Sequence, residues 1–204
     1  MTISWPTTLP VSTRGAAEIV ITPNMAGGVS ESPFTGEQQV YMHPGEWWAI
    51  ELQLGAMNRA DAEEWLGALL GLNGPEGTFL VGDPMGVAPR GTWASPLVNG
   101  ASQTGKVLNI DGMAAGATWK RGDWFQLGSG SSTRLHKITA DGTANCSCEG
   151  TIDFWPRLRS SPGNNDPLTL TNTVGIWRLA SRGVPWTLRD VQYNGIVIAG
   201  IEAL

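Results

Sequence analysis

The side chains best suited to acid–base or nucleophilic chemistry are scattered along this sequence. His43 is followed at once by Pro44-Gly45, and His136 alternates within a short apolar segment. Neither histidine has a carboxylate or nucleophile at a spacing that indicates a catalytic pair, so each is interpreted as structural or surface-exposed. Cys146 and Cys148 have poor spacing for a disulfide in an extended segment, and with no histidine nearby we interpret them as free thiols rather than metal ligands.

The densest acidic residues and the most glycine-rich loop also have structural explanations. Asp61, Glu63 and Glu64 have helical spacing opposite an apolar stripe, which is typical of a solvated helix face, with a glycosidase pair as the alternative. The Gly/Ser loop 128–132 lacks the Lys-Ser/Thr pair and the following helix of a phosphate-binding loop. We therefore expect no catalytic residue, no cofactor and no metal, and interpret the chain as non-enzymatic.

The composition favours a β-rich assembly protein. Charged residues make up 15% of the 204 residues, below the roughly 25% of ordinary globular chains. Ten Trp residues stand against two Tyr and four Phe, and Trp is enriched both at interface hot spots and in cores. The 27 Gly and 13 Pro without a repeating period indicate short strands joined by tight turns.

Charge and hydropathy exclude two classes of partner. The net charge of −5 comes without a basic cluster, so we expect no sequence-specific nucleic-acid binding. No apolar run is long enough for a membrane span or a signal core, so we expect no membrane partner and a chain that stays soluble in a cytoplasm-like compartment.

Hydrophobic periodicity predicts a hairpin, a helix and a strand in the first half of the chain. The hairpin covers 38–54 and turns at Pro44-Gly45; the helix covers 58–72 with Asn58 as its N-cap; a buried strand covers 78–81. The candidate core and assembly positions of these elements are Trp48, Ile50, Leu52, Trp65, Leu66, Leu69, Leu70 and Phe79.

Short strands between Gly-containing turns follow. They are expected over 106–110, 123–127, 134–139 and 151–155, and again near 168–171, 174–179 and 191–201. The fold class is mainly β: residues 38–97 and 166–204 form one β unit with the helix, and 98–165 form a small inserted β domain resembling a barrel or a sandwich.

Residues 1–37 are interpreted as an extended N-terminal arm without a core of its own. Because extended segments can add to a neighbour's sheet edge, we expect the arm to dock on an adjacent subunit through Trp5, Ile19 and Ile21. Further interface candidates are Trp119, Trp124 and Trp155.

Several strings of residues resemble one family. They are 58–65 (NRADAEEW), 77–84 (GTFLVGDP), 89–92 (PRGT), 98–105 (VNGASQTG), 120–128 (KRGDWFQLG), 134–138 (RLHKI) and 154–159 (FWPRLR). Over residues 38–204, the order of these strings and their residue types are similar to those of distal tail proteins and related minor tail proteins of long-tailed, siphovirus-like bacteriophages and prophages.

This resemblance implies a β-sandwich of tail-tube type with one flanking helix. It also implies a structural virion protein, assembled in the host cytoplasm, that forms a ring, most simply a hexamer, at the tail tip. Its partners would be the tail tube and the tip, baseplate or hub proteins. The alternatives are another tail ring subunit (tube, terminator or connector), or a carbohydrate-binding adhesin whose Trp119, Trp124 and Trp155 stack on sugars.

Overall fold

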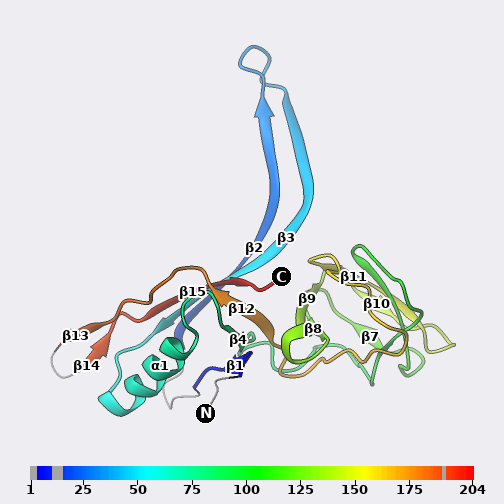
Figure 1. Cartoon of the computed structure of the whole chain (residues 1–204). Coiled ribbons are helices and arrows are strands. Elements are labelled where there is room, and N and C mark those ends of the chain that lie inside the picture. Colours follow the sequence, from blue (N-terminus) through cyan, green and yellow to red (C-terminus); the bar gives the residue numbers. More distant parts are fainter. Residues whose placement is uncertain (1–3, 11–15, 190–191) are drawn as a thin grey trace.

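The structure is a computed structural model that describes residues 4–10, 16–189 and 192–204, and the chain is mainly β, as the sequence predicts (Figure 1). The larger sheet has the strand order β1 (Thr7–Thr8), β4 (Thr78–Val81), β12 (Gly175–Leu179), β15 (Val197–Glu202), β3 (Gln38–Leu54) and β2 (Ala16–Glu31). β1 pairs parallel with β4, and the remaining neighbours pair antiparallel.

Helix α1 (Arg59–Gly71) packs an apolar stripe against this sheet. Asn58 is its N-cap and accepts a hydrogen bond from the Asp61 backbone N–H at 3.0 Å. The core around it contains Trp48, Ile50, Leu52, Trp65, Leu66, Leu69 and Phe79. The expectation that Leu70 belongs to the core is wrong, because its side chain is 69% exposed. Leu70 lies one residue, about 100° of helix rotation, beyond the buried stripe.

A second unit has its own sheet and core. Its strand order is β5 (Leu97–Val98), β6 (Val107–Asp111), β11 (Gly150–Trp155), β9 (Arg134–Ile138) and β8 (Trp124–Leu127), all antiparallel. A 3₁₀ turn, η1 (Gly130–Ser132), joins β8 to β9, and β7 (Thr118–Trp119) pairs with β10 (Gly142–Thr143). The segment 168–170 returns over this core without forming a strand of its own, and Thr169 bridges to Gln126.

Tryptophans join the two units from the inside. The ring of Trp48 lies 5.2 Å from that of Trp124 and 4.3 Å from that of Trp155, measured between ring centroids. Trp124 is 5% exposed and Trp119, in the second core, is 3% exposed. The expectation that these two residues form an interface or a sugar platform is therefore wrong: their indoles fill the cores of their own chain.

The hairpin of the larger sheet also differs from the expected one. β3 passes through Pro44-Gly45 without turning, and its partner is β2, with a register from Ala16↔Leu54 to Glu31↔Gln38. The turn lies at 32–37. Residues 16–31 of the expected N-terminal arm are thus a strand of the chain's own sheet; residues 1–3 and 11–15 lie outside the described part.

The C-terminal segment is interrupted where a single strand was expected. β13 (Thr187–Arg189) and β14 (Gln192–Asn194) form a small ladder, and β15 begins only after Gly195. Gly195 has φ +69°, a left-handed conformation that glycine adopts without steric cost. In the described part of the chain, no helix has the length and apolarity that crossing a bilayer requires.

Candidate assembly surface

The most distinctive surface of the molecule is the distal half of the β2–β3 hairpin, which leaves the body as a free ribbon (Figure 1). β15 pairs with β3 only from Ala49 to Gln53. Beyond that point, within the described residues, β2 and β3 have only one another as ladder partners, so both edges of the ribbon present unpaired backbone groups. Such edges are templates for pairing with another chain.

A register shift lies where the ribbon leaves the body. Met25 pairs with Glu46 and Gly27 with Met42, so β3 uses four residue steps where β2 uses two. The additional residues of β3 surround Pro44. Proline has no N–H to donate and is tolerated at such a bulge, which explains why this Pro-Gly pair does not end the strand.

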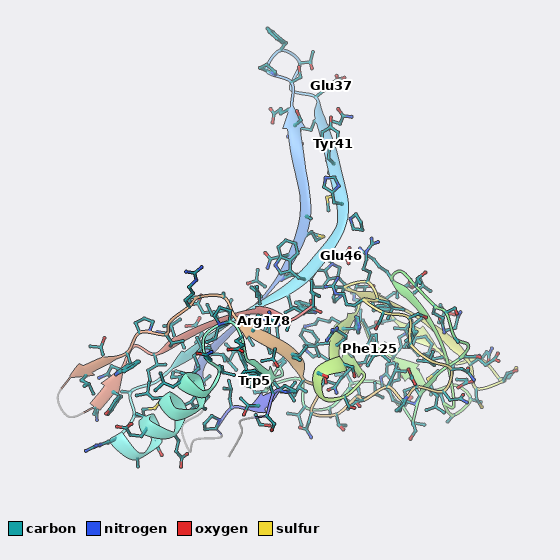
Figure 2. The ribbon with its side chains drawn as sticks, viewed as in Figure 1. Trp5, Glu37, Tyr41, Glu46, Phe125 and Arg178 are labelled. Carbon is teal, nitrogen blue, oxygen red and sulfur yellow. The ribbon has the colours of Figure 1, made fainter. Side chains whose placement is uncertain are left out.

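Both faces of the ribbon carry apolar side chains. Val29 and Val40 form a cross-strand pair and are 61% and 59% exposed. Because side chains alternate along a strand, Tyr41 lies on the opposite face from Val40 and Met42, and it is 49% exposed. Figure 2 shows Tyr41 midway along the ribbon and Glu37 near its tip. An isolated two-stranded ribbon is marginally stable by itself, so covering these exposed apolar side chains with another surface would stabilise this one.

The ribbon is also acidic. Residues 16–58 contain no Asp, Lys or Arg, and of the five Glu in this stretch Glu31 and Glu37 lie exposed near the tip, whereas Glu46 is buried beside Lys106. Partners that carry Arg or Lys are therefore favoured at its tip and edges.

A buried carboxylate fixes the base of the ribbon to the second unit. Glu46, 4% exposed, lies where the ribbon meets the body (Figure 2). Its Oε1 is 2.5 Å from Lys106 Nζ, and its Oε2 accepts a hydrogen bond from the Arg157 backbone N–H at 2.9 Å. Arg159 donates to the Glu46 carbonyl and, at 2.8 Å, to Glu202 Oε2. Strands β3 and β15 are thereby joined to both ends of the second unit.

Electrostatics keep this junction charged. Burial by itself raises the pKa of Glu46, but the Lys106 hydrogen bond, the Arg157 N–H and the two cations together outweigh burial and hold that pKa below its ordinary value. Glu202, 8% exposed, accepts a hydrogen bond from the Trp48 backbone N–H at 3.1 Å as well as from Arg159. The ribbon therefore has a rigid base rather than a hinge.

The remaining interface candidates lie away from the ribbon's distal half. Ile19 and Ile21 are half-buried against the core of the larger sheet, and Trp155 is partly buried against the same core. Trp5, beside β1, is 40% exposed and is the one expected anchor with a substantial free surface (Figure 2). Ile19 and Ile21 belong to an edge strand of the chain's own sheet rather than to a free arm, and the docking of this segment on another subunit stays a prediction.

Sequence reasoning missed the exposed ribbon residues and the Glu46 junction. Pro23, Gly27 and Gly28 interrupt the β-branched pattern of the first strand, and Pro44-Gly45 mimics a turn in the second. The long stretch without a basic residue was the available signal. Among the described residues, no three His, Cys, Asp or Glu side chains gather as a metal site would require.

Comparison with known proteins adds no relative: no family model matches the sequence, and no curated protein matches it significantly.

Proposed function

We propose that this chain is a non-enzymatic structural subunit of a bacteriophage tail, forming a ring at the distal end that joins the tail tube to the tip or baseplate hub. The observation that carries the proposal is the free ribbon of β2 and β3. Its apolar side chains are uncovered on both faces and its edges are unpaired, which is a liability in a monomer and an asset in a closed assembly.

The finer architecture belongs to the same proposal. The larger sheet with α1 would be the ring-forming unit of tail-tube type, and the unit from β5 to β11 would be the inserted domain at the ring's periphery. The Glu46 junction supports this division of roles because it holds the ribbon at one angle to the inserted unit. Identical subunits can close a ring only if that angle is the same in each.

The test is the oligomeric state and shape of the purified protein. Sedimentation combined with negative-stain electron microscopy should show annular particles with an open centre, and sixfold symmetry is expected from the family resemblance. A chain that remains monomeric at concentrations of hundreds of micromolar, and that does not associate with tail-tube or hub proteins on co-expression, contradicts the proposal.

The same micrographs separate a distal ring from a tube subunit. A ring component should stop at one or two layers, whereas a tube subunit should stack into long cylinders of constant diameter. Cylinders would replace the distal-ring assignment by a tube assignment within the same class of tail protein.

A further inference from the structure

An apolar groove of about 510 Å³ lies beside the C-terminal half of α1, far from the ribbon. Its floor includes the buried side chains of Leu66, Leu69 and Leu179. Its rim carries two side chains with large free surfaces, Leu70 at 69% and Trp186 at 44%. A groove of this size, with an apolar floor and an aromatic rim, is suited to a bulky apolar anchor.

The groove has one cationic group on its rim. Arg182 is exposed, lines the groove, and makes no ion pair with any described residue. Glu64 lies two residues before Leu66 on the helix, and Glu76, in the loop after it, accepts a hydrogen bond from Asn73, and neither residue lines the groove. The groove therefore presents apolar surface with an unneutralised positive charge.

The tip of the ribbon has the complementary character. Phe34 is 95% exposed, and Glu31 and Glu37 are exposed on either side of it. The turn is preformed: Ser32 N–H donates to Glu37 O and Gly36 N–H to Ser32 O, each at 2.9 Å. Ser32 Oγ also accepts from Phe34 N–H, and Gly36 has φ +70°. A preformed turn presents its aromatic side chain with little further loss of entropy on binding.

The tip cannot reach the groove of its own chain, because the ribbon extends away from α1 (Figure 1). From Met25, opposite Glu46, to Glu31, opposite Gln38, β2 has six residue steps, or roughly 20 Å at about 3.3 Å per residue. An apolar projection at one end of a molecule and a matching groove at another make a head-to-tail contact between copies, which closes into a ring when the rotation allows.

From these features we infer that the ribbon tip of one copy docks into the groove of a neighbouring copy, with Phe34 between Leu70 and Trp186 and Glu37 facing Arg182. The inference rests on the proposed function, since it names the contact by which the subunits would assemble. The occupant is a second copy of this chain rather than an unrelated protein, because the tip and the groove match in apolar character and are opposite in charge.

Photocross-linking locates the contact. A benzophenone amino acid is placed at position 34, and chains of natural and ¹⁵N isotope content are mixed before irradiation. Mass spectrometry should then find mixed-isotope pairs linked to residues 66–75 or 182–186. Links only to the inserted unit or to another ribbon, or no links in an assembled sample, overturn the docking site.

Substitutions measure its strength by sedimentation equilibrium. Phe34→Ser should weaken self-association by about tenfold or more, as expected of an aromatic anchor. Met85→Ser, at an apolar side chain that is 92% exposed elsewhere, should change it less than twofold. Glu37→Arg and Arg182→Glu should each weaken association and should restore it when combined. An unchanged association constant in Phe34→Ser, or failure of the combined variant to recover, overturns the inference.

The results separate this inference from the proposed ring. Rings that form with cross-links mapped elsewhere would overturn the docking site and leave the ring proposal standing. A chain that stays monomeric at every concentration would overturn both.

Discussion

Acidification should destabilise this protein through His136, a residue that the sequence did not mark as special. Its ring is stacked on Phe125, with centroids 5.1 Å apart, and meets Phe154 edge-on at 5.0 Å. The Nδ1–H group donates to the Pro156 carbonyl at 2.8 Å. Burial lowers the pKa of His136 to about 4, with the charges of Arg159 and Arg134 acting in the same direction and the Pro156 hydrogen bond opposing them.

The magnitude follows from the two pKa values of this group. In the unfolded chain His136 has its ordinary pKa of 6.5, so below that pH the unfolded state binds a proton that the native state does not. The contribution of neutral His136 to the free energy of unfolding is therefore fully present above pH 6.5 and is lost as pH falls toward 4. Between pH 7.5 and pH 5 the loss is roughly 2 kcal/mol.

Urea unfolding of the wild type and of His136→Phe at pH 7.5, 6.5, 5.5 and 5 measures this loss. Phe keeps the ring packing but cannot titrate. The variant carries a constant offset because the Pro156 carbonyl loses its donor, so only the pH dependence is diagnostic. The wild type should lose roughly 2 kcal/mol more than the variant across this range. If the losses of the two proteins between pH 7.5 and pH 5 differ by less than about 0.5 kcal/mol, the reasoning is refuted.

Three further outcomes follow from the packing and the Glu46 junction. Leu69→Ala, at a buried position, should cost about 2–5 kcal/mol in denaturant melts, whereas the adjacent Leu70→Ala should cost less than about 0.5 kcal/mol; equal losses would contradict the orientation of α1. Glu46→Gln should cost about 1–3 kcal/mol at pH 7. Because the pKa of Glu46 in the folded protein lies below its ordinary value of 4.5, the difference in unfolding free energy between wild type and variant should be full above pH 4.5 and should shrink as pH falls through the lowered pKa. A difference that stays unchanged at pH 3 would show that the charge of Glu46 is not its source. A chain beginning at Ser32 should lack cooperative unfolding by circular dichroism, since β3 loses its partner β2 along its whole length; a stable fold would restore the view of this segment as a dispensable arm.

Local patterns in the sequence were sufficient for α1 and β4. The helix combines a capping Asn58, an early acidic turn and apolar residues at Ala62, Trp65, Leu66 and Leu69, and the structure buries all four of these. The strand Thr78–Val81 is a short apolar run bounded by glycines, and it occupies the same residues in the fold. In both cases the signal lies within one element and needs no distant partner.

The ribbon could not be predicted because its register depends on long-range pairing. Pro44-Gly45 is a turn signal in isolation, and only the pairing with Met25 and Gly27 converts it to a bulge. The tryptophans show a related limit. Composition indicates that large aromatic surfaces need cover, but whether Trp124 is covered by Trp48 or by another chain depends on how the two units meet.

The central claim, assembly through the free ribbon, is tested most directly by shortening the ribbon while keeping the body. Gly27 and Met42 are paired across the hairpin, so residues 28–41 can be replaced by Asn-Gly, a two-residue turn that suits antiparallel strands. Sedimentation and negative-stain electron microscopy of the full chain and the shortened chain are then compared at equal concentration, with circular dichroism confirming that both are folded. The account predicts annular assemblies for the full chain and folded monomers for the shortened one. Rings of the same size and stability from both chains would contradict it.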